Sequence, residues 1–205
     1  MRNVSLFLIV FLTTGFLGSI GGTSTVSNQH EMVYVSAEQQ KMSTIISKTD
    51  ETLQIKKQLH NEQVNCMAKN IFFEAAVEST AGKLAVAQVT LNRVNSTWYP
   101  NTVCEVVYEG STYTASDGQQ LPRRDRCQFS WYCDGKDDIP PTNSRSWDSS
   151  FLLAQYVLEN KDNLVDITDG ALHYHARYIK APFWTKKKKV TAVIDQHIFY
   201  KSITH

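Results

Sequence analysis

The chain has 205 residues and carries 21 Lys and Arg against 20 Asp and Glu, so its formal net charge is +1. This length is typical of one domain with an extension, and 42% hydrophobic residues supply enough apolar surface for a core. These values exclude a largely disordered protein. They also disfavour nucleic acid as a partner, because no overall positive field attracts phosphate.

Residues 1–29 have the composition of an export signal. Arg2 precedes an apolar stretch over residues 4–20, and small and polar residues follow from Gly21. Two alternatives stay open, namely cleavage near Ile20 or retention as a weak signal anchor that associates transiently with the inner membrane. In both cases we expect the rest of the chain in the periplasm or cell envelope, where thiols oxidise.

The remaining chain divides into a polar spacer over residues 30–64, helical toward its end, and a compact domain over residues 65–205. Residues 109–146 are predicted to form a long structured loop, because three of the five prolines and two Asp-Gly pairs lie there. Helices followed by a small antiparallel sheet near the C-terminus define an α+β fold. Apolar spacing predicts helices over 66–77, 80–94, 102–108 and 147–160, and alternation predicts strands over 171–176 and 190–200.

Two acidic residues, Glu74 and Glu78, interrupt an apolar segment of the first predicted helix of the compact domain. Burial raises the pKa of a carboxyl group and keeps it protonated near neutral pH, which a general acid requires. Glu74 is the candidate acid, and Glu78 lies one turn further on the same face, where it either orients the site or binds nearby backbone. The alternative is that both carboxylates lie on the exposed face of an amphipathic helix.

Histidines and lysines near the C-terminus allow two interpretations each. His173 and His175 lie on one face of a predicted strand and His197 on its partner strand, so the three either bind a metal or line a sugar-binding cleft. The run Lys186–Lys189 indicates either a solvated turn or a contact with an anionic envelope polymer.

The four cysteines are expected to form disulfides outside the cytosol. Cys127 and Cys133 are too far apart for a zinc knuckle and suit a small disulfide-closed loop. We predict that Cys66 pairs with Cys104, although four cysteines allow three pairings. No metal or other cofactor is expected.

Several blocks follow one another between about Cys66 and Tyr200: Asn70–Ser79, Lys83–Val94, Tyr99–Val107, Gln128–Ser130, Ala171–Ala176, Trp184 and His197–Tyr200. In this order they resemble the catalytic domain of the cell wall hydrolases typified by spore-cortex-lytic enzymes. No separate peptidoglycan-binding repeat is recognisable, so the substrate need not be spore cortex. The Cys127–Cys133 insert and the weak export signal are more similar to enzymes of Gram-negative bacteria or their phages, including endolysins that lyse the host cell.

The resemblance implies a lysozyme-like, mainly helical fold and cleavage of the β-1,4 bond between N-acetylmuramic acid and N-acetylglucosamine in peptidoglycan. It implies a lytic transglycosylase in which Glu74 is the catalytic acid and base, acting on glycan strands. We expect a monomer. Three alternatives remain: a muramidase-type hydrolase, a zinc amidase that uses His173, His175 and His197, and a non-catalytic wall-binding protein. The substrate-binding candidates are Glu78, Gln128, Ser130, His173, His175, Trp184 and Tyr200.

Overall fold

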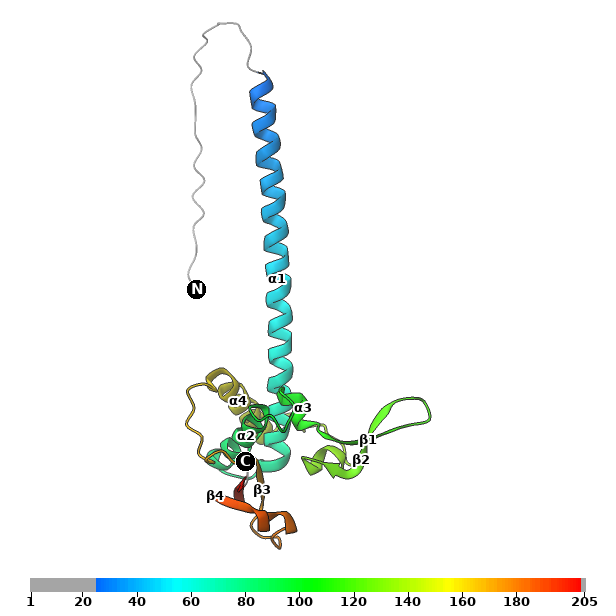
Figure 1. Ribbon diagram of the computed structural model, residues 1–205, viewed down its shortest axis with the longest axis vertical. Helices are drawn as coiled ribbons and strands as arrows, with labels where there is room; N and C mark the ends of the chain where they lie inside the picture. The colour runs from blue at the N-terminus through cyan, green and yellow to red at the C-terminus, as the bar shows by residue number, and fades with distance from the viewer. Residues whose placement is uncertain (1–24, 204–205) are drawn as a thin grey trace. The chain divides into compact units, whose positions relative to one another are not determined.

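The computed structural model describes residues 25–203, so most of the predicted export signal lies outside the described residues (Figure 1). The chain divides into one unit up to Thr52 and a second from Leu53 onward. Helix α1, Thr25–Ala75, runs through the boundary as one continuous helix, so the predicted spacer and the predicted 66–77 helix are parts of a single element. No described helix is long and apolar enough to cross a membrane.

The described part of the first unit is the N-terminal half of α1. From residue 36 to Thr52 every side chain of this helix is exposed, and the apolar residues Met42, Ile45 and Ile46 are each at least half exposed. Several hydroxyls bond to the carbonyl one turn earlier, such as Thr44 Oγ1 to the oxygen of Gln40 at 2.9 Å. This segment therefore adds no core of its own.

Three further helices form the second unit with the last turns of α1: α2, Thr80–Val94, α3, Val103–Val107, and α4, Arg145–Asn160. A hydroxyl side chain caps the N-terminus of each, because Ser79, Thr102 and Ser144 accept hydrogen bonds from backbone N–H groups of the first turn. The predicted helices over 80–94, 102–108 and 147–160 are confirmed to within two residues.

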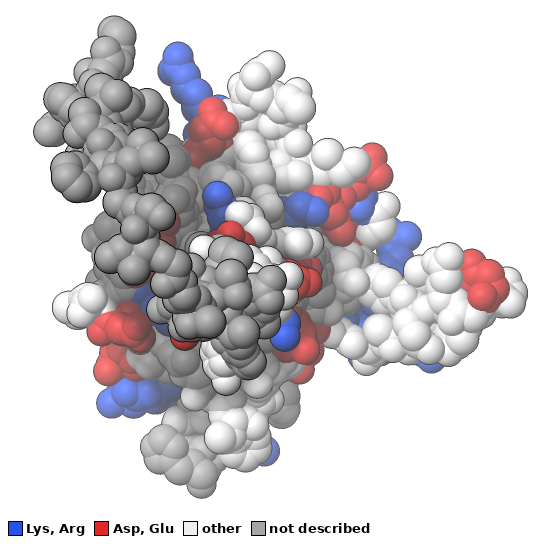
Figure 2. All heavy atoms as spheres, turned by 90° about the horizontal axis from the view of Figure 1, so that it is seen from above, with Lys and Arg blue, Asp and Glu red and all other residues white. Residues whose placement is uncertain are grey.

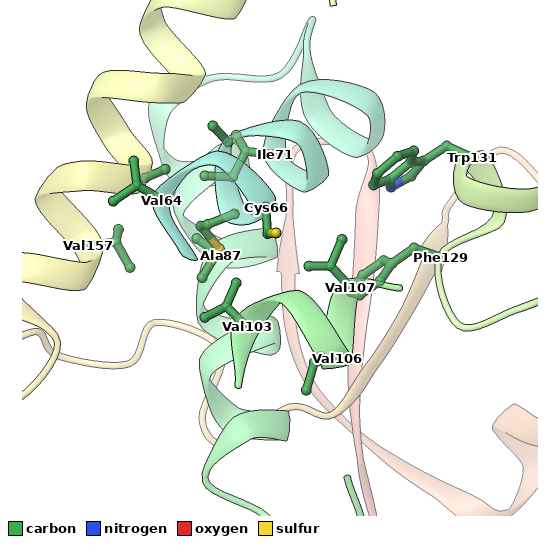
Figure 3. Close-up of a cluster of buried hydrophobic side chains, with 13 residues drawn as sticks. Val64, Cys66, Ile71, Ala87, Val103, Val106, Val107, Phe129, Trp131 and Val157 are labelled. Atoms are coloured by element: carbon green, nitrogen blue, oxygen red, sulfur yellow. The ribbon is translucent and has the colours of Figure 1, made fainter. Parts of the chain in front are cut away.

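The main hydrophobic core lies where these helices meet the loop over residues 128–133 (Figure 3). The Cys66–Cys104 disulfide joins α1 to α3 at a Cα–Cα distance of 5.2 Å. Phe129 and Trp131 bring the loop into the same core, although they are more than fifty residues from Met67 in sequence. The buried members are Val64, Cys66, Met67, Ala68, Ile71, Ala87, Val103, Val106, Val107, Phe129, Trp131, Ala154 and Val157.

A three-stranded antiparallel sheet has the order β3-β5-β4, with β3, His173–Ala176, β4, Lys188–Ile194, and β5, His197–Ser202. The single strand predicted over 190–200 is wrong, because Asp195, with a φ of 48°, turns the chain into a hairpin there. The Asp195 carboxylate accepts hydrogen bonds from the backbone N–H and the hydroxyl of Ser79, at 2.9 and 2.6 Å. These bonds fix the hairpin turn to the start of α2.

The predicted loop over residues 109–146 contains a second hairpin, β1, Gly110–Thr114, and β2, Gln120–Cys127, which extends to one side of the helices in Figure 1. A short 3-10 helix, Ser130–Cys133, follows, and the predicted Cys127–Cys133 disulfide closes this segment. The hairpin was missed because its residues are nearly all exposed, so burial imposes no alternating pattern on them. The α+β class is confirmed: helices dominate, and the sheets are small and antiparallel.

Candidate active site

Glu74 lies in the last turn of α1, one residue before the helix ends. The hydroxyl of Tyr174 on β3 donates a hydrogen bond to Glu74 Oε2 at 3.0 Å, and no other described residue hydrogen-bonds to the carboxyl group. Burial raises the pKa of Glu74, opposed by the Tyr174 hydrogen bond and by the charge of Arg93. Glu74 is only partly buried, so its free oxygen can meet a substrate.

A buried hydrogen-bond network supports the helix turn that carries Glu74. The side chain of Asn70, fully buried, accepts a bond from Trp131 Nε1 and donates one to Thr90 Oγ1, both at 3.0 Å. Trp131 stacks on Phe73 with ring centroids 4.7 Å apart and an interplanar angle of 20°. Asn70 therefore fixes the position of Trp131, and Trp131 in turn holds Phe73, the residue next to Glu74.

The positive charge of Arg93 favours the ionised form of Glu74. Arg93 lies on the inner face of α2, only 4% exposed, and its Nε donates to the carbonyl of Leu172 at 2.9 Å. Its guanidinium is 4.7 Å from the ring centroid of Phe129 and 5.2 Å from that of Tyr99. Nη1 is buried and has no hydrogen-bond partner among the described residues.

A cleft of about 1010 Å³ lies between the α2–α3 connection and the end of the C-terminal sheet. Glu74 does not line this cleft. The charge of Arg93 acts on both places: it opposes the burial that raises the pKa values of Glu74 and of Glu109, and it adds to the burial that lowers the pKa of His173. The lining residues are Ser96, Trp98, Tyr99, Glu109, Gln128, Asp169, Gly170, Leu172, His173, Lys188, Lys189, Lys201, Ser202 and Ile203.

The cleft is lined by both charged and uncharged side chains. Burial lowers the pKa of His173 to about 4, helped by the nearby charges of Lys188 and Arg93, so this imidazole is uncharged at neutral pH. Burial also raises the pKa of Glu109, against the attraction of Arg93, and Glu109 Oε2 has no hydrogen-bond partner in the described residues. On the face shown in Figure 2, acidic and basic side chains are interspersed, consistent with the near-zero net charge.

Of the predicted substrate-binding residues, Gln128 and His173 line the cleft. Ser130 is exposed at the start of the 3-10 helix, outside the cleft lining. Glu78 Oε2 accepts a hydrogen bond from the backbone N–H of Gln196 at 3.1 Å, so this carboxylate braces the β4–β5 turn.

His175 and Tyr200 bond to each other, with 2.9 Å between His175 Nε2 and the Tyr200 hydroxyl, and the other ring nitrogen of His175 contacts the carbonyl of Ala176. Trp184 packs edge-on against Tyr200, with centroids 5.4 Å apart. These three side chains form an aromatic cluster that does not line the cleft.

The three histidines do not converge. His173 and His175 both contact Trp184 on one face of the sheet, at ring-centroid distances of 5.6 and 5.9 Å. His197 lies 5.2 Å from Tyr174 on the opposite face, because β-strand side chains alternate. Within residues 25–203 no three His, Cys, Asp or Glu side chains form a metal-binding group. This geometry contradicts the alternative of a zinc site built from these histidines.

Two residues of the site had no predicted role. Tyr174 lies between His173 and His175 in the sequence, and the alternation of side chains along a strand places it on the face opposite to theirs. Arg93 follows Val86 and Val89 at helical spacing, so it shares their buried face. A cation on an apolar helix face was the available signal for Arg93.

Similarity to known proteins adds independent information. A spore cortex-lytic enzyme of Bacillus subtilis (strain 168) is 40% identical over 60 residues, which are 29% of this chain and 20% of that protein. One from Oceanobacillus iheyensis is 44% identical over 57 residues, which are 27% of this chain and 21% of that protein. The matches thus span about a fifth of the length of these relatives.

A crystal structure of the catalytic domain of the Bacillus cereus SleB protein superposes with a TM-score of 0.48 at 29% identity, covering 68% of this chain and 89% of that one. The model of the family described as Cell Wall Hydrolase matches residues 77–200, which include most of the cleft lining but not Glu74 or the lining residues from Lys201 onward. Since this match covers more than half of the sequence, the chain belongs to the cell wall hydrolase family.

Proposed function

We propose that this protein is a peptidoglycan-degrading lytic transglycosylase with Glu74 as its single general acid and base. The observation that carries the proposal is the environment of Glu74, a partly buried carboxyl group with a raised pKa and one oxygen held by Tyr174. A raised pKa lets a carboxyl group keep its proton to higher pH, and such a group can donate the proton to a glycosidic oxygen. The spore cortex-lytic relatives and the family support peptidoglycan as the substrate.

In the proposed reaction, Glu74 donates its proton to the oxygen that links C1 of N-acetylmuramic acid to C4 of N-acetylglucosamine. The C1–O bond breaks, and the leaving sugar departs with a new hydroxyl group. The C6 hydroxyl of the same muramic acid then attacks C1 and gives its proton to the Glu74 carboxylate. A 1,6-anhydro ring forms, no water is consumed, and Glu74 is again protonated.

Tyr174 has a defined part in this cycle. By donating to Oε2 it stabilises the ionised form of Glu74, which exists only between the two proton transfers. It also leaves Oε1 as the atom that carries the proton. Burial of the carboxyl group and the Tyr174 hydrogen bond act in opposite directions, so the pKa of Glu74 is raised without preventing ionisation.

The test is digestion of purified peptidoglycan followed by mass spectrometry of the fragments. We expect 1,6-anhydro ends from the wild type. Glu74→Gln should lose at least about a hundredfold in rate while keeping its fold and its binding to peptidoglycan. Glu159→Gln changes an exposed acid on α4 that accepts a hydrogen bond from Gln155; it is the matched control and should keep full activity.

Other products would replace the proposal. Reducing ends would indicate a muramidase-type hydrolase, and released stem peptides would indicate an amidase. Unchanged lysis by Glu74→Gln would exclude Glu74 as the acid, and absence of cleavage with retained wall binding would indicate a non-catalytic protein.

We further propose that the protein acts in the periplasm or cell envelope as a monomer, after export through its N-terminal segment, and that it serves cell lysis of the endolysin type. The two disulfides support an oxidising compartment. The N-terminal sequence of the protein recovered from expressing cells tests whether the segment before Gly21 is removed.

A further inference from the structure

We infer that Lys188 and Lys189 form a subsite for a free carboxylate of a peptidoglycan stem peptide, at the end of the cleft formed by the C-terminal sheet. Both side chains line the cleft, together with Lys201. The inference rests on the proposed function, because the stem peptide would be attached to the glycan strand that Glu74 is proposed to cleave.

The register of the sheet places these lysines relative to Glu74. Tyr174, which bonds to Glu74, lies directly opposite Phe199 on β5. Lys201 is two residues further along β5 and lies opposite Lys189 on β4. Since side chains two residues apart share a face, Lys189 and Lys201 leave the sheet on the face that carries Tyr174. Lys188 lies opposite Ser202 and leaves on the other face, which carries His173, so the cleft at the end of the sheet is lined from both faces. Lys189 and Lys201 are separated from Phe199 along the strands by about 7 Å.

Of the three lysines that line the cleft, only Lys201 has an acidic partner among the described residues. Lys201 forms an ion pair with Asp169, with 2.8 Å between Nζ and Oδ2. Lys188 Nζ instead donates to a neutral group, the hydroxyl of Ser202, at 3.3 Å. Lys189 is exposed, and no described acidic side chain forms an ion pair with it. Two ammonium groups therefore face the cleft without a carboxylate partner.

Two acidic side chains, Asp169 and Glu109, line the same cleft. Asp169 is paired with Lys201, and burial disfavours the charged form of Glu109 by raising its pKa, so Lys188 and Lys189 still favour an anionic ligand over a neutral one. His173, in the same cleft, is uncharged at neutral pH, so it neither repels nor neutralises the ligand. Burial lowers the pKa of Lys188, and a partly desolvated ammonium gains more from an anion than one in bulk water. The glycan backbone of peptidoglycan is neutral, whereas its stem peptides carry free carboxylates. An ammonium group also donates hydrogen bonds to a carboxylate without requiring a fixed orientation, which suits a flexible peptide.

The remaining lysines of the run have a different environment. Lys186 lies 5.0 Å from the ring centroid of Phe183 and does not line the cleft, and Lys187 ends the short 3-10 helix Phe183–Lys187. Of the two interpretations of the run, the structure assigns the anion contact to Lys188 and Lys189, and a solvated turn to Lys186 and Lys187. Two pairs of equal charge thus provide a matched comparison.

The experiment uses peptidoglycan freed of covalently attached phosphate polymers. Half of it is amidated at its carboxylates with carbodiimide and methylamine. On the untreated substrate, the double variant Lys188→Gln/Lys189→Gln should raise KM about twofold to fivefold with kcat unchanged, roughly what one exposed ion pair contributes. Lys186→Gln/Lys187→Gln should match the wild type. Amidation should raise the wild-type KM by a similar factor and leave the Lys188→Gln/Lys189→Gln variant unaffected.

Equal losses in both double variants would show a general effect of charge and overturn the subsite, as would a wild-type KM that amidation leaves unchanged. The subsite can also be measured without cleavage. Co-sedimentation of Glu74→Gln, with and without the Lys188→Gln/Lys189→Gln changes, compares binding to untreated and amidated peptidoglycan. If the wild type cleaves no glycosidic bond yet this binding difference persists, the proposed function fails and the subsite stands.

Discussion

Replacing Asn70 by alanine tests whether the buried network beneath Glu74 holds the site together. The change leaves Trp131 Nε1 without an acceptor in the core, which costs about 1 to 3 kcal/mol. It also removes the bond to Thr90, whose hydroxyl still donates to the carbonyl of Val86, for about 1 kcal/mol. We therefore expect the free energy of unfolding to fall by about 2 to 4 kcal/mol.

Urea unfolding of the full chain with intact disulfides measures this loss as a lower midpoint at unchanged slope. The decisive control is the same substitution in a Trp131→Phe background, where the ring still stacks on Phe73 but the indole N–H is gone. There the cost of Asn70→Ala should be smaller by about 1 to 3 kcal/mol, because no donor is left unsatisfied. Equal costs in both backgrounds would refute the reasoning.

The other predictions concern pH and the disulfides. Tyr174→Phe removes a hydrogen bond that lowers the pKa of Glu74, so the alkaline limb of the pH–rate profile should move to higher pH; an unmoved limb would contradict the assigned contact. Replacing both cysteines of Cys66–Cys104 by serine should cost about 4 kcal/mol, and the same change at Cys127–Cys133 about 2 kcal/mol, because the closed loops differ in length; denaturant midpoints measure both losses. Burial alone would raise the pKa of Asp166, yet hydrogen bonds from Thr168, Asn92 and Gly170 leave it below its ordinary value of 3.8. The ionised carboxylate therefore stabilises the fold at pH values above 3.8, and this stability is lost as the pH falls through the lowered pKa. Thermal unfolding of Asp166→Asn should accordingly depend less on pH below about pH 4 than that of the wild type.

Local sequence signals were sufficient for much of the fold. Helices α2 and α4 follow from apolar spacing, a signal that acts within a few residues. The two disulfide pairings and the acidic residue in the last turn of α1 were also predicted from sequence. The hairpin over Gly110–Cys127 was not, because an exposed hairpin has no buried face to impose a pattern.

The partners of Glu74 were decided by the tertiary structure alone. Tyr174 is 100 residues from Glu74 in sequence, and it reaches the carboxylate because β3 turns that face, rather than the His173 face, toward the helices. The separation of Lys188 and Lys189 from Lys186 likewise depends on where β4 begins and on its register with β5. Sequence thus determined that an acidic residue lies in an apolar helix segment and where α2 and α4 run, because those signals are local. The packing of the sheet against α1 and α2 decided which of those residues meet, since long-range contacts depend on the face that each strand buries.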